Sequence, residues 1–206
     1  MILLAGLNSL YLGGQSPVPP EYTALQYIEC GLDTGTPQIA GVSGIGFNDT
    51  IKLSCEFLQP VNGANWLFFF YTWDFSVRSF KLEGYRQSAL HRWCSTTMNE
   101  QNTDFVSGPL ELTCSKSVCE LNGVNYPVNC GTSDTSADLG RIFHFALSQS
   151  CRAYSFDVID SNGVYTHHLI PCKRNADNVL GFYDTVVGNF KGAINNEGWT
   201  IAGPAL

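Results

Sequence analysis

The chain has 206 residues, of which 44% are hydrophobic, 13% aromatic and only 14% charged, and its formal net charge at pH 7 is −7. This length suits one all-β domain and is sufficient to bury a core without covalent cross-links. The negative charge disfavours binding to nucleic acid and to anionic membrane surfaces, because both are negatively charged themselves. The low charged fraction predicts a surface rich in small polar residues or one covered by partners.

Residues 1–14 are mostly apolar and predict an N-terminal docking arm. They lack the positively charged start and the cleavage site of a signal peptide, and they are too short to cross a bilayer, so we expect folding in the cytoplasm. Three prolines within residues 15–20 predict a semi-rigid connector. So short an arm cannot bury its own side chains, so we expect it to dock on another subunit, with folding back onto its own domain as the alternative. The predicted assembly-docking residues are Ile2, Leu3, Leu4, Leu7, Leu10, Tyr11 and Leu12.

Residues 21–206 contain short strand-like segments between turn residues, which is typical of an antiparallel β-sandwich. Thr50–Phe57 alternates apolar and polar residues, which predicts one buried and one solvent-exposed face. Trp66–Trp73 is continuously apolar, which predicts a strand covered on both faces. No long segment has a helical period, and Thr135–Leu139 predicts at most one helical turn. The expected strands are Ala24–Cys30, Thr50–Phe57, Trp66–Trp73, Ser76–Lys81, Gly108–Cys114, Ser117–Leu121, Val124–Val128, Arg141–Leu147, Arg152–Ile159 and Tyr165–Cys172.

Two Asn-Gly pairs stand between apolar segments and predict β-hairpins. Asn122-Gly123 precedes Val124, and Asn162-Gly163 precedes Val164. A type I′ turn needs positive φ at both central residues, which Asn and Gly tolerate best.

The eight cysteines predict buried thiols, because a chain that folds in a reducing cytosol keeps them reduced. Four disulfides are the alternative, and the sequence cannot choose among their pairings. A zinc site is a further alternative, although structural zinc motifs use tighter Cys pairs. Its ligands would be Cys114, Cys119, His168 and Cys172. We expect no cofactor. Ca²⁺ is a second candidate ion, because several aspartates lie in turn-rich segments, although their spacing is not that of an EF-hand. These aspartates are Asp157, Asp160, Asp177 and Asp184.

The sequence predicts no enzyme. A glycosidase needs two carboxylates across a cleft, and no such cluster is visible, although a hairpin would bring Glu111 and Glu120 face to face. His91 lies near Cys94, but no third group or oxyanion hole accompanies them.

Aromatic side chains are candidates for stacking on sugar rings, although most aromatics of a β-sandwich belong to its core. The candidates are Trp66, Tyr71, Trp73, Tyr85, Trp93 and Trp199.

Both ends of the main domain resemble a known family. The opening combines a Tyr-Ile-Glu strand, a Thr-Gly turn and an Asn-led strand, in Glu21–Glu29, Asp33–Gly35 and Asn48–Leu53. The closing part comprises Tyr154–Val158, Asn162-Gly163, His168–Asn175, Gly181–Asp184, Gly188–Phe190 and Ala202–Pro204. These segments resemble the concanavalin A-like (laminin-G-like) domains of bacteriophage minor structural proteins, and Tyr11–Gly13 is similar to the segment that precedes such domains.

The resemblance implies an all-β jelly-roll sandwich at residues 21–206 and a non-enzymatic virion structural protein. Its location would be the virion surface, as capsid decoration, head fibre or tail-associated protein. Its expected partners are other virion proteins and further copies of itself, and its candidate ligand is a host or environmental glycan. The resemblance carries no catalytic residue and no fixed ligand residue. The alternative is a free carbohydrate-binding lectin or adhesin of a bacterial surface.

Overall fold

A computed structural model describes most of the chain from residue 16 to the C-terminus. The described residues are 16–31, 36–46, 48–59, 66–71, 78–85, 87–94, 97–103, 107–115, 117–127, 140–145, 150–194 and 198–206, with the backbone alone for 66–103, 127 and 144–145. Among them every strand pairing is antiparallel, and no α-helix occurs. The predicted all-β class and β-sandwich are therefore confirmed.

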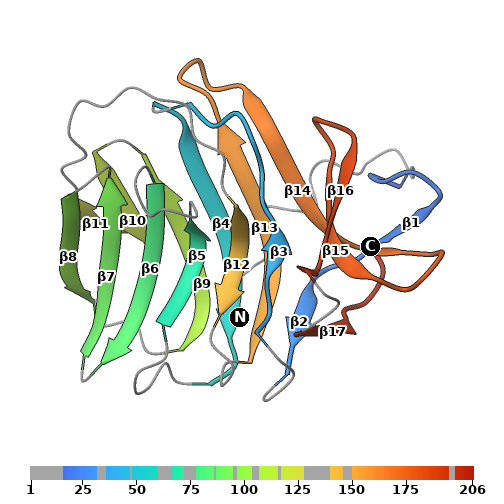
Figure 1. Cartoon of the computed structure of the whole chain (residues 1–206), viewed down its shortest axis with the longest axis horizontal. Coiled ribbons are helices and arrows are strands. Elements are labelled where there is room, and N and C mark those ends of the chain that lie inside the picture. The colour runs from blue at the N-terminus through green and yellow to red at the C-terminus, as the bar shows by residue number, and fades with distance from the viewer. Residues whose placement is uncertain are drawn as a thin grey trace.

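Two sheets contain the strands (Figure 1). The large sheet has the order β11-β10-β9-β4-β13-β14-β15-β16, with β1 beside β14 and with β2 between β13 and β17. The small sheet has the order β3-β12-β5-β6-β7-β8. The strands are β1 Tyr22–Ala24, β2 Ile28–Cys30, β3 Ile39–Ala40, β4 Thr50–Phe57, β5 Trp66–Tyr71, β6 Arg78–Tyr85, β7 Gln87–Cys94, β8 Thr97–Thr103, β9 Gly108–Cys114, β10 Val118–Leu121, β11 Val124–Pro127, β12 Arg141–Phe145, β13 Cys151–Ile159, β14 Tyr165–Arg174, β15 Leu180–Asp184, β16 Asn189–Gly192 and β17 Trp199–Ala202.

The main core lies on the inner face of the large sheet. In β4 every second residue is buried, from Ile51 to Phe57, while the residues between them point outward. The same alternation continues across β9 and β13, its neighbours in the sheet. This is the alternation that the sequence predicted, because successive side chains of a strand point to opposite faces.

Phe143 of β12 joins the small sheet to the large one. Its ring stacks on Phe182 with centroids 5.4 Å apart, and it meets Phe156 and Trp199 edge-on at 6.3 and 6.2 Å. The φ angle of Phe143 is +49°, a left-handed conformation that is unusual for a bulky side chain. The aromatic contacts therefore hold a backbone conformation that Phe does not favour by itself.

A second, smaller cluster covers the outer face at the β14–β16 end of the sheet. Val18, from the proline-rich connector, is 5% exposed and packs with Ile170 and Cys172 of β14. Tyr22 stacks on Phe190 at 5.3 Å. The described part of the connector thus lies against the main domain, whereas residues 1–14, with all the predicted docking residues from Ile2 to Leu12, lie outside the described residues.

Both predicted Asn-Gly hairpins are present, with different turns. Asn122 and Gly123 have φ of 48° and 81°, as a type I′ turn requires. At the second hairpin only Gly163 of the pair has positive φ, and Gly163 N–H donates to the Asp160 carbonyl at 3.0 Å. This is a type I turn followed by a glycine in the left-handed region, with a register shift between Val158 and Ile159.

The predicted strand bounds agree with the structure at β4 and β9 and within a few residues at most other strands. The expected segment Ala24–Cys30 forms two strands, β1 and β2, with Leu25 to Tyr27 between them. Strands β3, β7, β8, β15, β16 and β17 were not predicted. Residues 135–139, the predicted helical turn, lie outside the described residues.

Candidate functional site

The outer face of the large sheet carries a continuous set of charged, hydroxyl-bearing and aromatic side chains. We call this set the polar face. Strands β2, β4, β9, β13 and β14 supply its members, since the other side of each strand faces the core. The polar face consists of Glu29, Lys52, Ser54, Glu56, Glu111, Arg152, Tyr154, Asp157 and His168, with Tyr27 and Tyr165 beside it.

Arg152 lies at the centre of one half of the polar face. Its Nε is 2.7 Å from Glu29 Oε2, and its Nη1 is 3.4 Å from Glu56 Oε2. The Tyr154 hydroxyl donates to the same Glu56 oxygen at 2.7 Å, and Arg152 lies over the Tyr27 ring at 4.7 Å. These contacts fix an arginine, two carboxylates and two aromatic rings in one place. The hydrogen bond to Glu29 raises the pKa of Arg152, so the guanidinium remains charged.

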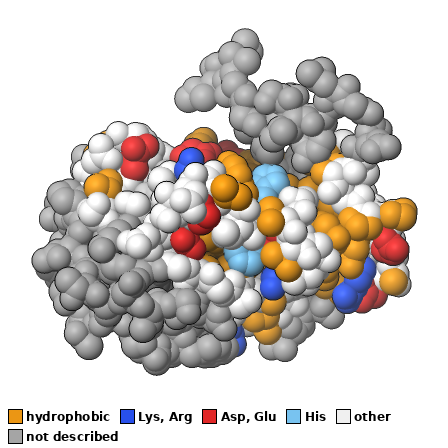
Figure 2. Space-filling view, turned by 90° about the horizontal axis from the view of Figure 1, so that it is seen from above, with side chains coloured by type: hydrophobic (Ala, Val, Ile, Leu, Met, Phe, Trp, Pro, Cys, Tyr) orange, Lys and Arg blue, Asp and Glu red, His pale blue; other side chains and the backbone are white. Residues whose placement is uncertain are grey.

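His168 and Asp157 form a pair in the other half of the polar face. His168 Nδ1 is 2.6 Å from Asp157 Oδ1, and the Tyr165 ring meets the imidazole edge-on at 5.7 Å. The hydrogen bond to Asp157 raises the pKa of His168 against the opposing effect of burial. Figure 2 shows histidine, acidic and hydrophobic side chains gathered at this end of the molecule. The exposed apolar residues of the two hairpin turns here are Val164, Val186 and Val187.

Glu111 occupies the β9 side of the polar face. Its carboxylate accepts a short hydrogen bond, 2.5 Å, from the Ser54 hydroxyl. Burial and the nearby charge of Asp157 raise the pKa of Glu111, while the Ser54 hydroxyl lowers it. Glu111 on β9 and Asp157 on β13 lie on either side of β4, so both carboxylates belong to the same face of the sheet.

This arrangement suits a ligand rich in hydroxyl groups. Carboxylates accept hydrogen bonds, Arg and Lys donate them, and tyrosine rings offer flat apolar surfaces beside them. Four carboxylates, Glu29, Glu56, Glu111 and Asp157, face two permanent cations, Lys52 and Arg152. The excess of negative charge favours neutral or amino-bearing ligands over acidic ones.

A buried ion pair lies directly behind this end of the polar face, on the inner side of β14. His167 Nδ1 is 2.6 Å from Asp184 Oδ2, and His167 Nε2 is 2.9 Å from the Ser43 carbonyl oxygen. Both partners are acceptors, so both ring nitrogens must donate, which requires the protonated imidazole. The bond to Asp184 accordingly raises the pKa of His167 against burial. Asp184 is fully buried, and although burial opposes ionisation, hydrogen bonds from His167 and from the backbone hold its pKa below the ordinary value.

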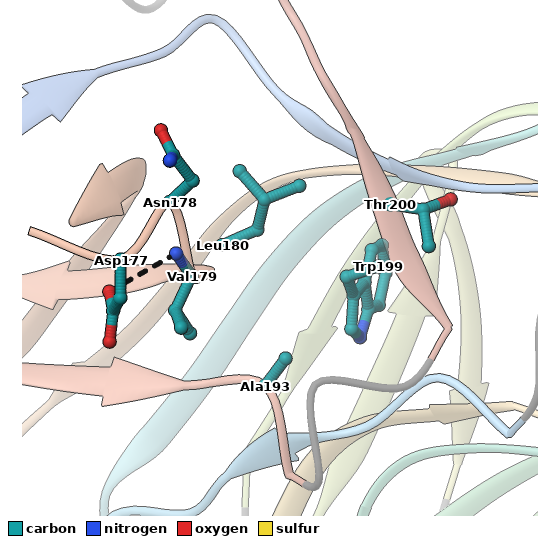
Figure 3. A pocket seen from close by; sticks show the side chains of 7 residues that line it. All are labelled: Asp177, Asn178, Val179, Leu180, Ala193, Trp199 and Thr200. Atoms are coloured by element: carbon teal, nitrogen blue, oxygen red, sulfur yellow. Dashed lines mark hydrogen bonds between the residues drawn. The ribbon is translucent and has the colours of Figure 1, made fainter. Parts of the chain in front are cut away.

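A hollow of about 260 Å³ opens elsewhere, where β17 begins beside the β14–β15 turn (Figure 3). Its polar lining consists of only three side chains, Asp177, Asn178 and Thr200, whereas the polar face brings together nine charged, hydroxyl-bearing or imidazole side chains. Trp199 is only 3% exposed and packs on Phe143 of the core. The polar face is therefore the better candidate site. The hollow is lined by Asp177, Asn178, Val179, Leu180, Ala193, Trp199 and Thr200.

The four cysteine and histidine residues considered for zinc lie in three places. Cys114 and Cys119 face the core on β9 and β10, His168 lies on the polar face, and Cys172 packs in the Val18 cluster. Among the described residues no group of three or more His, Cys, Asp or Glu side chains is arranged to hold a metal ion.

The aspartates considered for calcium are also dispersed. Asp157 binds His168, Asp177 binds Arg174, and Asp184 binds His167. Asp160 accepts the Asn162 and Val164 N–H groups in its own turn, both at 2.8 Å. Each carboxylate therefore has a separate local partner.

The candidate catalytic residues and the candidate sugar-stacking aromatics are the last of the predicted residues to be placed. Glu120 lies opposite Thr113, and Glu111 lies opposite Asn122, so the two glutamates are not directly paired across the hairpin. Trp199 is a core residue, which excludes it as a stacking platform. The side chains of His91, Cys94, Trp66, Tyr71, Tyr85 and Trp93 lie outside the description, as does Trp73 entirely.

The aromatics that the structure places at the polar face are Tyr27, Tyr154 and Tyr165, none of which the sequence analysis selected. One signal was available for Tyr154, because Arg152 and Tyr154 alternate with the apolar Cys151 and Ala153. The pairing of Glu29 with Arg152, 123 residues apart, had no signal in the sequence.

No helix among the described residues is long and apolar enough to cross a membrane. The chain matches no protein-family model, no curated protein and no solved structure.

Proposed function

We propose that this chain is a non-enzymatic structural protein of the bacteriophage virion surface whose β-sandwich binds neutral or amino-bearing glycans through the polar face. The observation that carries the glycan part is the Arg152 network. It holds Glu29, Glu56, Tyr27 and Tyr154 in a fixed arrangement before any ligand arrives. Groups that are already ordered lose little conformational entropy on binding.

The virion part is supported by the sequence resemblance at both ends of the main domain. The closing segments of that resemblance lie in β13, β14 and β15. Strands β13 and β14 contribute side chains to the polar face, and β15 contributes Asp184 to the buried ion pair behind it. The proposal covers capsid-decoration, head-fibre and tail-associated positions alike. Residues 1–14 are proposed to bind other virion proteins or further copies of this chain.

Binding of the purified full chain to a glycan array tests the first part. We expect signals on neutral and amino-bearing glycans and weaker signals on sialylated or sulfated forms of the same glycans, because the polar face carries an excess of carboxylates. No binding to any glycan, or a preference for the acidic forms, would overturn the assignment of the ligand.

Mass spectrometry of purified particles tests the second part. We expect the chain in intact virions, and we expect deletion of residues 1–14 to remove it from particles while its thermal melt stays nearly unchanged. A chain that binds glycans but is absent from particles would instead be a free lectin or adhesin of a bacterial surface.

A further inference from the structure

Cys114 and Cys119 face each other across the β9–β10 hairpin. They are direct partners in the register, and the next pair toward the turn is hydrogen-bonded, with Ser115 N–H donating to the Val118 carbonyl at 2.8 Å. Hydrogen-bonded and non-hydrogen-bonded pairs alternate along antiparallel strands, so Cys114 and Cys119 form a non-hydrogen-bonded pair. In such pairs the α-carbons are about 4.5 Å apart, which lies within the range that a disulfide bridges.

The two side chains point in the same direction and are close together. Both point to the inner face of the large sheet and are 1% exposed. Their Sγ atoms lie 2.7 Å apart, so one thiol is directed at the other. Little side-chain movement is therefore needed to bond the two sulfur atoms.

Another opposed pair, Cys30 of β2 and Cys151 of β13, differs in this respect. The Cys30 thiol donates to the Cys151 carbonyl at 3.5 Å, and the Cys151 thiol donates to the Arg152 carbonyl at 3.4 Å. Burial raises the pKa of both thiols and raises the pKa of Cys172 to about 12. The Cys30 and Cys151 thiols are thus directed at backbone carbonyls and not at each other, so this pair is an internal comparison for Cys114 and Cys119.

We propose that Cys114 and Cys119 are a site of reversible oxidation, forming an intramolecular disulfide when the folded chain meets a low-molecular-weight disulfide such as oxidised glutathione. The thiolate of one cysteine attacks the oxidant, forming a mixed disulfide and releasing one small thiol. The second thiolate then displaces the other small thiol and closes the protein disulfide. The two cysteines together lose two electrons and two protons, and the oxidant is reduced to two thiols.

The location of the pair explains how an oxidant reaches it and what the bond does. Strand β11 is an edge strand of the large sheet, and β10 and β9 follow it. Edge elements open locally more readily than central strands, which exposes the buried thiols for a short time. The bond would then lock β10 to β9, next to Glu111 on the polar face. This inference does not rest on the proposed function.

The test uses the full chain, folded and reduced, then incubated with oxidised glutathione, unfolded in an alkylating reagent and analysed by peptide mass spectrometry. We expect a Cys114–Cys119 disulfide that lacks two hydrogens and the alkyl label, while Cys30, Cys55, Cys151 and Cys172 are labelled. We also expect the melting temperature to rise by a few degrees and to return after reduction, since a short disulfide loop stabilises modestly.

Alkylation of both Cys114 and Cys119 after oxidation, or a disulfide from either to another cysteine, would overturn the proposal. Cys119→Ala supplies the matched comparison, because it leaves Cys114 without a partner while adding no polar group to the core. We expect this variant to show no rise in melting temperature with the oxidant. The peptide masses of the unsubstituted chain decide the question even if the variant does not fold.

Discussion

The inner and outer faces of the large sheet are built from the same strands, but the inner face carries apolar side chains and the outer face carries charged and polar ones. On β13 the inner residues Phe156 and Val158 are fully buried in the aromatic core. Arg152 and Asp157 point to the outer face, where Arg152 pairs with Glu29 and Asp157 pairs with His168. The inner face holds the two sheets together, and the outer face holds charged groups in fixed positions. The comparison predicts that inner substitutions reduce stability, whereas outer substitutions alter binding with little effect on stability.

The largest effect is expected for Phe143→Ala. The substitution removes a fully buried ring that contacts Phe156, Phe182 and Trp199, and it leaves a cavity between the sheets. We expect the free energy of unfolding to fall by about 3–5 kcal/mol, measured by denaturant titration. Val164→Ala, at a side chain that is 59% exposed, serves as the control and should change it by about 0.5 kcal/mol or less. Equal effects of the two would contradict the assignment of the core.

The next effect is expected for Asp184→Asn. Asparagine retains the shape of the side chain but leaves the protonated His167 without its charged partner in a buried site. Hydrogen bonds to charged groups contribute about 1.5–3 kcal/mol, so we expect a loss of that size in the free energy of unfolding. A variant as stable as the original chain would show that His167 is neutral in the folded protein.

The same pair predicts how stability depends on pH. The pKa of His167 is raised, so its contribution is complete below the ordinary value of 6.5 and is lost as the pH rises through the raised value. The pKa of Asp184 is lowered, so its contribution is present above the ordinary 3.8 and is lost as the pH falls through the lowered value. We therefore expect the stability difference between the original chain and Asp184→Asn to be largest between about pH 4 and pH 6.5. Thermal melts across the pH range measure it, and a difference that does not vary with pH would contradict the ion pair.

The smallest effect on stability is expected at the polar face. Glu56→Gln retains the shape of a side chain that is 26% exposed and weakens its bonds to Arg152 and Tyr154. Partly exposed ion pairs contribute little, so the free energy of unfolding should fall by about 1 kcal/mol or less. A loss as large as that of Phe143→Ala would mean that the outer network is structural, and it would remove the contrast between the two faces.

The sequence predicted those parts of the fold that depend on local pattern. The predicted bounds of Thr50–Phe57 and Gly108–Cys114 were correct to the residue, and in Thr50–Phe57 the alternation of apolar and polar residues also identified the buried face. The hairpin predicted at Asn122-Gly123 was confirmed, because the turn conformation depends on those two residues themselves. Strands such as β8, Thr97–Thr103, contain few apolar residues and give no such pattern.

The candidate site was beyond local pattern, because it depends on register between distant segments. Arg152 meets Glu29 and Glu56 only because β2 and β4 lie beside β13. The sequence selected Glu111, Asp157 and His168 individually, but for a glycosidase or for metal sites rather than for a shared face. The left-handed conformation of Phe143 likewise has no local signal, since core contacts impose it.

Calorimetric titration with the glycan that binds best on the array tests the central claim most directly, comparing Glu56→Gln with Glu21→Gln. Glu21 lies near β1, away from the polar face, and undergoes the same change of charge. If the polar face binds the glycan, Glu56→Gln should weaken binding about tenfold or more, while Glu21→Gln binds like the original chain. Unchanged affinity in Glu56→Gln, or an equal loss in both variants, would contradict the assignment of the polar face as the glycan site.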